Sequence, residues 1–150
     1  MPLERKVIFP CYNLCFPGIY RIVIMNGRWI VQVIEAIKLQ QTNEISISLP
    51  RPYIFPHCFD YLKITWTNLS CPVQDLEFKM RVFAVPEGYS FEQSYYMEEY
   101  DIELSQQALE LPCYQFDIIH AQFCFEIVSV HKFTARFNEW ARRCVYTENC

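Results

Sequence analysis

The residue types best suited to chemistry are a histidine and a cysteine in the stretch IIHAQFCFEIV at 118–128. On a helix, His120 and Cys124 would lie one turn apart and could share a zinc ion. On a strand they would lie on one face but about 13 Å apart, and a zinc ion with bonds of about 2.0–2.3 Å cannot join them. Because the stretch is rich in Phe, Ile and Val and has no helix cap, we expect a strand and no shared metal.

Two further pairs contain residue types that bind metals. Cys11 and Cys15 are separated by three residues, and His57 directly precedes Cys58. With His120, these residues are the weak candidates for a zinc site, and a zinc or Cys/His protein is the third function that we consider. No CxxC pair occurs, and a buried thiol is the commoner role of a cysteine. We therefore predict no metal and no cofactor.

The chain also lacks the common sequence motifs of enzymes. A Cys–His pair could in principle act as a nucleophile and base, but neither GxSxG nor HExxH is present. The three glycines are far apart, so a glycine-rich phosphate loop is excluded. Glu98 and Glu99 lie in a dense acidic segment and are expected on a solvated face. We predict a protein that is not an enzyme.

The use of cysteine depends on the compartment. The first residues, MPLERKVIFP, lack the apolar run of a signal peptide, and no apolar run is long enough for a transmembrane segment. We therefore expect a cytoplasmic or other intracellular location, where thiols stay reduced. The eight cysteines are then expected to be mostly buried thiols.

Alternating apolar residues predict most of the fold. Asn26–Gly27, between two β-branched runs, predicts a hairpin with a type I′ turn joining strands at 19–25 and 28–37. The stretches at 60–68 and 75–85 also alternate with period two, and we expect them to pair as antiparallel neighbours.

The end of the chain has a different pattern. Phe133, Phe137, Trp140, Ala141 and Cys144 follow the spacing of one helical face, so an amphipathic helix is predicted at about 131–144. The predicted fold is mainly β. It is a single domain over 1–150, an antiparallel β-sandwich or partly open barrel of seven to eight strands with one C-terminal α-helix.

Charge is distributed unevenly. Residues 82–131 contain nine acids and no lysine or arginine, and tyrosines, which are good contact residues, lie among those acids. An acidic face on one copy could meet the basic C-terminal helix of another. The predicted interaction surface consists of Tyr89, Tyr95, Tyr96, Glu98, Glu99, Tyr100, Arg136, Arg142 and Arg143.

The layout also resembles that of a known family. ERKVIFP near the start, SLPRPYIFP before the paired strands and a closing aromatic and basic helix are similar in arrangement to the small β-sandwich matrix proteins of negative-strand RNA viruses. The resemblance implies a viral matrix or coat-type subunit that forms a homo-oligomer, located in the virion.

These observations leave three functions. The first is a non-enzymatic structural protein that self-associates. The alternative is an intracellular adaptor or regulator that docks a cellular protein through the acidic, tyrosine-rich segment. The third is the zinc or Cys/His protein. Contact of the basic helix with nucleic acid or acidic lipid is a weaker possibility.

Overall fold

The computed structural model describes residues 8–9, 18–33, 36–39, 44–69, 71 and 73–148. The chain divides into two compact units, Met1–Asn43 with Ser70–Gln74, and Glu44–Leu69 with Asp75–Cys150. Twelve strands and three short 3₁₀ helices form in the described residues, and no α-helix does. The predicted mainly β fold with antiparallel sheets is therefore confirmed, and no closed barrel forms among these strands.

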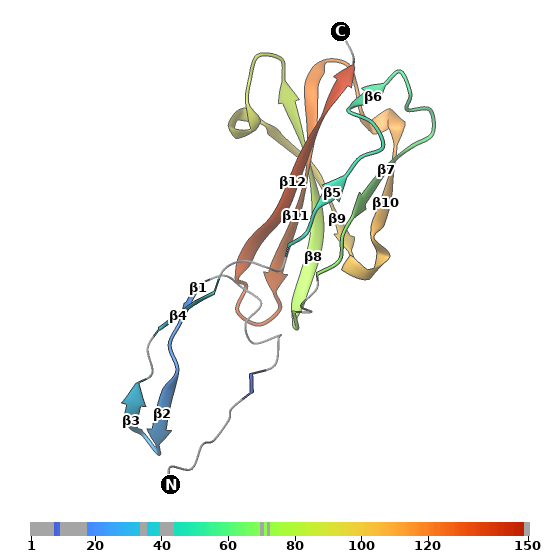
Figure 1. The fold of residues 1–150 in the computed structure, drawn as a ribbon. Helices are drawn as coiled ribbons and strands as arrows, with labels where there is room; N and C mark the ends of the chain where they lie inside the picture. The colour runs from blue at the N-terminus through green and yellow to red at the C-terminus, as the bar shows by residue number, and fades with distance from the viewer. Residues whose placement is uncertain are drawn as a thin grey trace. The chain divides into compact units, whose positions relative to one another are not determined.

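The first unit contains two small antiparallel ladders (Figure 1). One pairs β1 (Gly18–Tyr20) with β4 (Ile37–Leu39). The other pairs β2 (Val23–Asn26) with β3 (Trp29–Val33). The strand predicted at 19–25 therefore corresponds to two strands, β1 and β2. The strand predicted at 28–37 covers β3 and the first residue of β4.

The hairpin turn lies one residue further along the chain than predicted. Asn26 pairs with Trp29, so the turn residues are Gly27 and Arg28. Gly27 has φ +59°, whereas Asn26 and Arg28 are not among the residues with positive φ. Positive φ at the first turn position alone is the pattern of a type II′ turn, which favours glycine there. The predicted type I′ turn at Asn26–Gly27 is wrong.

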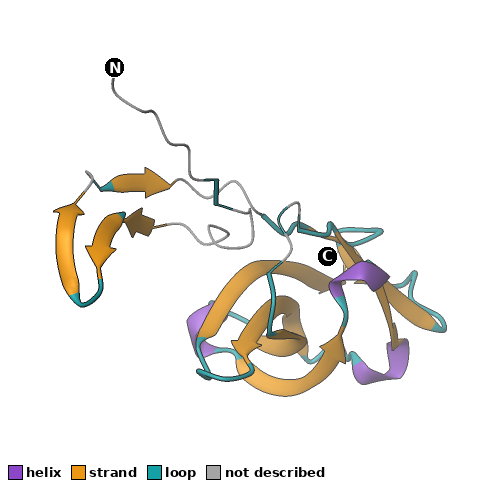
Figure 2. Ribbon diagram, turned by 90° about the horizontal axis from the view of Figure 1, so that it is seen from below, coloured by secondary structure: helices purple, strands orange, loops and turns teal. Residues whose placement is uncertain are grey.

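The second unit consists of two sheets. The three-stranded sheet has the order β10–β7–β5 and the five-stranded sheet has the order β6–β12–β11–β8–β9. Their strands are β5 (Ile47–Ser48), β6 (Tyr53–Phe55), β7 (Tyr61–Trp66), β8 (Leu76–Pro86), β9 (Tyr95–Ile102), β10 (Ala108–Pro112), β11 (His120–His131) and β12 (Phe137–Glu148). The 3₁₀ helices are η2 (Phe91–Gln93), η3 (Leu104–Gln106) and η4 (Cys113–Gln115). Seen from below in Figure 2, these strands curve around a common interior.

The core follows the predicted alternation. Leu62, Ile64 and Trp66 of β7 are buried, and so are Met80 and Val82 of β8. β7 and β8 do not pair with each other, however. β7 pairs with β10 and β5, and β8 pairs with β11 and β9. The alternation revealed which residues are buried, but partner choice depends on contacts between distant segments.

The predicted C-terminal helix at about 131–144 is wrong, because the chain turns after β11 and returns as β12. Ala135, within the turn, has φ +57°, which an α-helix cannot contain. In β12, Val145 and Thr147 are buried whereas Tyr146 and Glu148 are exposed, the alternation of a strand. Long antiparallel pairing with β11, from Gln122–Tyr146 to Val130–Phe137, outweighs the helical spacing.

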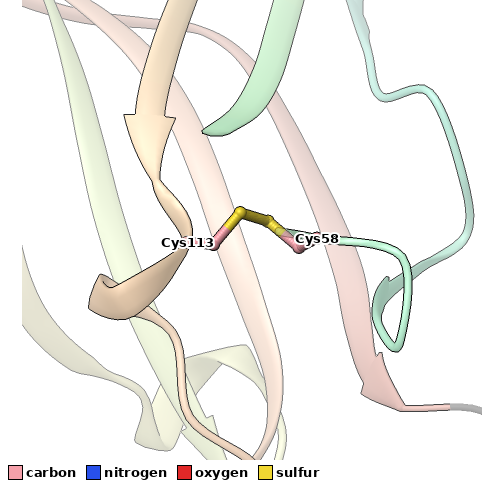
Figure 3. The surroundings of a disulfide bond; sticks show 2 residues. All are labelled: Cys58 and Cys113. Carbon is pink, nitrogen blue, oxygen red and sulfur yellow. A yellow bond between two sulfur atoms is a disulfide. The ribbon is translucent and has the colours of Figure 1, made fainter. Parts of the chain in front are cut away.

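The expected thiols are replaced by disulfides. Cys58 is bonded to Cys113 (Figure 3), Cys124 is bonded to Cys144, and Cys71 is also disulfide-bonded. The fold brings these residues together: Cys124 and Cys144 are directly opposite in the β11–β12 ladder, and Cys113 N–H donates to Asp60 O, close to Cys58. The prediction of buried thiols is wrong for these five cysteines. It rested on the lack of an apolar run in the first residues, which carries no information on which cysteines lie close together.

Candidate interaction surface

One face of the five-stranded sheet carries a band of charged and aromatic side chains. We define the outer face as the side of this sheet that carries Lys79, Arg81 and Phe83 of β8. Cross-strand neighbours place Glu126 opposite Arg81 on one side and Glu99 opposite it on the other. The opposite side of β8 carries the core residues Met80 and Val82, whereas the buried Phe83, with Val85 and Cys124, forms a smaller apolar cluster that Phe91 packs against. Because side chains alternate along a strand, a row of polar residues on one side and apolar residues on the other is the pattern of a half-buried sheet.

Arg81 lies at the centre of the outer face. Its guanidinium is 3.6 Å from Glu126 Oε1. It also lies 5.0, 5.6 and 5.7 Å from the ring centroids of Phe83, Tyr96 and Phe137. An arginine among aromatic faces gains cation–π attraction, and the rings restrict its side chain. Tyr96 and Phe137 are each about half exposed and remain accessible, whereas Phe83 is buried.

Glu126 is the buried acid of this face, with 3% of its surface exposed. Burial raises the pKa of its carboxyl group, and the nearby charge of Glu139 raises it further, whereas Arg81 and Arg142 lower it. A buried carboxylate is costly without a cationic partner. Arg81 and Arg142 supply that charge.

Arg142 lies over the ring of Phe91, with its guanidinium carbon 3.9 Å from the centroid. Phe91 begins η2, whose start is fixed because Ser90 N–H donates to Gln93 Oε1. The Phe91 ring meets that of Phe83 edge to face at 5.2 Å. Three segments of the chain thereby form one aromatic and arginine cluster.

The acidic, tyrosine-rich segment forms most of β9, the last strand of the sheet. Lys79 Nζ lies 3.2 Å from Glu99 Oε1 and 3.4 Å from Asp101 Oδ1, and hydrogen bonding to these two acids raises the lysine pKa. Some of the predicted acidic surface is therefore neutralised within the chain. Tyr95 and Tyr96 are 60% and 52% exposed and keep most of their contact area.

Glu98 points to the other side of β9, beside a cavity of about 230 Å³. The cavity has apolar walls from Val82, Met97 and Phe116. Tyr100 Oη is 3.1 Å from Glu98 Oε2 and 3.0 Å from Gln115 Oε1, which also line the cavity. Burial raises the pKa of Tyr100, so its hydroxyl keeps its proton as a hydrogen-bond donor.

The predicted surface residues are only partly brought together. Tyr96, Glu99 and Arg142 share the outer face, whereas Glu98 and Tyr100 face the cavity side. Arg142 and Arg143 are adjacent on β12, so their side chains leave opposite sides of the sheet. Tyr89 lies in the turn after β8, where its N–H donates to Pro86 O. Arg136 lies in the β11–β12 turn, where its carbonyl accepts from His131 N–H.

The candidate metal ligands do not form a site in the described part of the chain, where no group of three or more His, Cys, Asp or Glu could hold an ion. Cys58 is in a disulfide, and His120 Nδ1 lies 2.8 Å from Asp117 Oδ1. His120 and Cys124 both lie on β11, so the predicted strand is confirmed. Cys11 and Cys15 lie outside the described residues.

The predicted interaction surface did not include Arg81, Glu126, Phe83, Phe91 or Phe137. One signal was available: Glu126 interrupts the apolar run FCFEIVSV, and a charge in such a run requires a partner. The identity of that partner depends on strand register and could not be deduced.

No protein-family model matches this chain, and no curated protein matches it. Among solved structures, the crystal structure of a polysaccharide deacetylase from Bacillus cereus is similar, with a TM-score of 0.45 and 12% sequence identity. The match covers 71% of this chain and 31% of that one, so the chain spans about a third of that protein's length. A likeness this distant defines neither the fold nor the function of this chain. In the described residues, no helix is long and apolar enough to cross a membrane.

Proposed function

We propose that this chain is a non-enzymatic protein-binding module that docks a partner through the acidic, tyrosine-rich surface of β9. The observation that supports this most directly is the position of β9 at the end of its sheet, paired only with β8 among the described strands. Its residues are mostly exposed. An edge strand of this kind offers both backbone hydrogen bonds and side-chain contacts to another chain.

The outer face supports the same function. Tyrosine, phenylalanine and arginine are enriched at the centres of protein interfaces. Here the half-exposed Tyr96 and Phe137 flank Arg81, which Glu126 and the rings already hold in place. A partner would therefore meet a side chain that has little conformational entropy left to lose.

The proposed module works in an oxidising compartment, not in the reducing one that the sequence suggested. Disulfides persist in extracellular and lumenal environments and are rare where glutathione keeps thiols reduced. Cys58, Cys71, Cys113, Cys124 and Cys144 are all in disulfides. While they stay oxidised, these cysteines cannot act as nucleophiles, which agrees with a non-enzymatic role.

Site-specific crosslinking tests the binding function. A photo-reactive phenylalanine analogue replaces Tyr95 on β9, and in a control it replaces Tyr61 on β7, because the two tyrosines are 60% and 62% exposed. We expect a crosslinked partner from position 95 only. That partner is then purified and titrated against the wild-type chain and Glu98→Lys. Equal crosslinking from both positions, or a partner whose affinity is the same for both chains, would contradict the proposal.

A self-assembling structural subunit, for example a viral matrix or coat-type protein, is the second candidate. The acids Glu99 and Asp101 and the cation Arg142 all lie on strands of one sheet, so one copy could present acids to the arginine of another. Light scattering coupled to size-exclusion chromatography, at low and high salt, separates the two functions. A salt-sensitive oligomer favours assembly, and a monomer at both salt concentrations favours the binding module.

A further inference from the structure

The free edge of β9 is long enough to accept another strand. β9 has eight residues, Tyr95–Ile102, and only Ile102 is buried. On one side it forms a ladder with β8 from Phe78–Ile102 to Ala84–Tyr95. Within the described residues, no strand pairs with its other side and no backbone hydrogen bond from elsewhere reaches it. Backbone N–H and C=O groups along that side are therefore available to a partner.

The cavity beside β9 lies where a side chain of an added strand would project. Glu98 and Tyr100 of β9 line it, and Gln115 and Phe116, at and after the end of η4, form its far side. Side chains of neighbouring strands point to the same side at matching positions. A strand added to β9 would therefore place alternate side chains over this cavity.

The chemistry of the cavity favours a long basic side chain. Its apolar walls suit the methylene stem of a lysine or arginine, and its carboxylate suits the charged end. Glu98 has no ion-pair partner within the described part of the chain. The single hydroxyl hydrogen of Tyr100 is shared between Glu98 and Gln115, so the carboxylate retains capacity for a strong donor.

A second copy of β9 fits this edge poorly. Antiparallel pairing of two copies about the middle of the strand would set Glu98 of each copy opposite Glu99 of the other, which is destabilising. The ladder also shifts register between Val82 and Phe83, which leaves Met97 as an extra residue. Charges and bulges are features that prevent edge strands from pairing with one another. The same acids attract a basic strand.

We infer that β9 binds an extended, basic segment of another protein, which adds a strand to the five-stranded sheet and places a lysine or arginine in the cavity beside Glu98. The inference rests on the proposed binding function and specifies its partner. Backbone hydrogen bonds supply the pairing, and Glu98 selects the basic side chain.

The test uses three synthetic peptides of ten residues with the full chain. The first alternates lysine and valine, the second alternates glutamate and valine, and the third is the lysine–valine peptide with alternate backbone nitrogens methylated. Fluorescence anisotropy gives the affinities, and hydrogen exchange with mass spectrometry locates the protected amides. We expect the first peptide to bind and to protect amides of Tyr95–Ile102. The second and third should bind at least about tenfold more weakly, because they lose the ion pair or the strand hydrogen bonds.

Two variants of the chain provide the matched comparison. Glu98→Lys should weaken binding of the lysine–valine peptide by at least about tenfold, since it reverses the selecting charge. Glu110→Lys makes the same charge change at an exposed glutamate on β10, an edge strand of the other sheet. It should change the affinity by less than about twofold, because exposed distant charges are screened.

Each other outcome overturns the inference in a recognisable way. Equal binding of the methylated peptide means attraction by charge without strand addition. Protection that depends on the concentration of the chain alone means that a second copy occupies β9. Peptide binding that protects only β8 and β12 contradicts strand addition, and the crosslinking at Tyr95 then decides separately whether a partner docks on β9. If no peptide binds and the crosslinking at Tyr95 also fails, both proposals are wrong.

Discussion

Glu126 is a carboxylate in the middle of an apolar strand, and its effect on stability should depend on pH. Burial raises its folded-state pKa above the usual 4.5, so the folded protein binds this proton more tightly than the unfolded chain. The resulting stabilisation is complete below the unfolded pKa and is lost as the pH rises through the folded pKa.

Replacing Glu126 by glutamine should remove this dependence. We expect the free energy of unfolding of Glu126→Gln to increase relative to that of wild type as the pH rises from about 4 to about 7, because only the wild type loses stability over this range. Urea denaturation across that range measures it, with Glu110→Gln as the control for loss of an exposed carboxylate. If the difference between Glu126→Gln and wild type is constant with pH, burial does not raise this pKa.

Gly27 offers a second test at the scale of one residue. Its φ of +59° lies in the left-handed region, where a β-branched residue is strained by about 1–2 kcal/mol. Gly27→Val should destabilise the β2–β3 hairpin by that amount, and Asn26→Val should be tolerated because Asn26 is a strand residue. Hydrogen exchange at Val23–Val33 measures both effects. Equal losses in the two variants would support the type I′ turn instead.

At the scale of elements, two disulfides close loops of different length. Cys58–Cys113 spans 55 residues, next to the end of the β7–β10 ladder, and Cys124–Cys144 spans 20 residues across the β11–β12 ladder. Chain entropy predicts a stabilisation of about 4 kcal/mol for the longer loop and about 3 kcal/mol for the shorter one.

Paired Cys→Ala variants compare the two disulfides. We expect Cys58→Ala with Cys113→Ala to lower the free energy of unfolding by about 1 kcal/mol more than Cys124→Ala with Cys144→Ala. Denaturant unfolding measures this. A second comparison of the variants with wild type under reducing conditions, where no disulfide is present, gives the part of the loss that comes from side-chain packing. Rapid thiol labelling of these four cysteines in native, unreduced protein would show that the disulfides are absent.

At the scale of the whole molecule, charge reversals on the two sides of the five-stranded sheet test whether copies self-associate through its outer face. If copies self-associate through the outer face, Glu99→Lys should weaken the oligomer at low salt. Adding Arg142→Glu to that variant should partly restore the oligomer. Glu98→Lys and Arg143→Glu are matched controls, because their side chains leave the other side of the sheet. Light scattering measures the molar mass. If all four variants assemble like wild type, the outer face is not the contact.

The sequence by itself determined which residues are buried along several strands. Leu62, Ile64 and Trp66 alternate with polar neighbours, and period-two alternation of this kind is a local property of a half-buried strand. The strand at His120–Cys124 was predictable for a different reason, because the stretch is rich in Phe, Ile and Val and has no helix cap. The acidic and tyrosine-rich composition of Tyr95–Ile102 was also visible, but its place at a sheet edge was not.

Only the tertiary structure decided the features that depend on distant partners. The helical spacing from Phe133 to Cys144 was outweighed because β11 offers β12 a long antiparallel ladder and a place for Cys144 opposite Cys124. In the same way, the register of β8 with β11 and β9 assembled Arg81, Glu126 and Glu99 from three segments. Strand pairing joins residues far apart in the chain, and its free energy depends on the fit between both strands, so neither segment alone could reveal it.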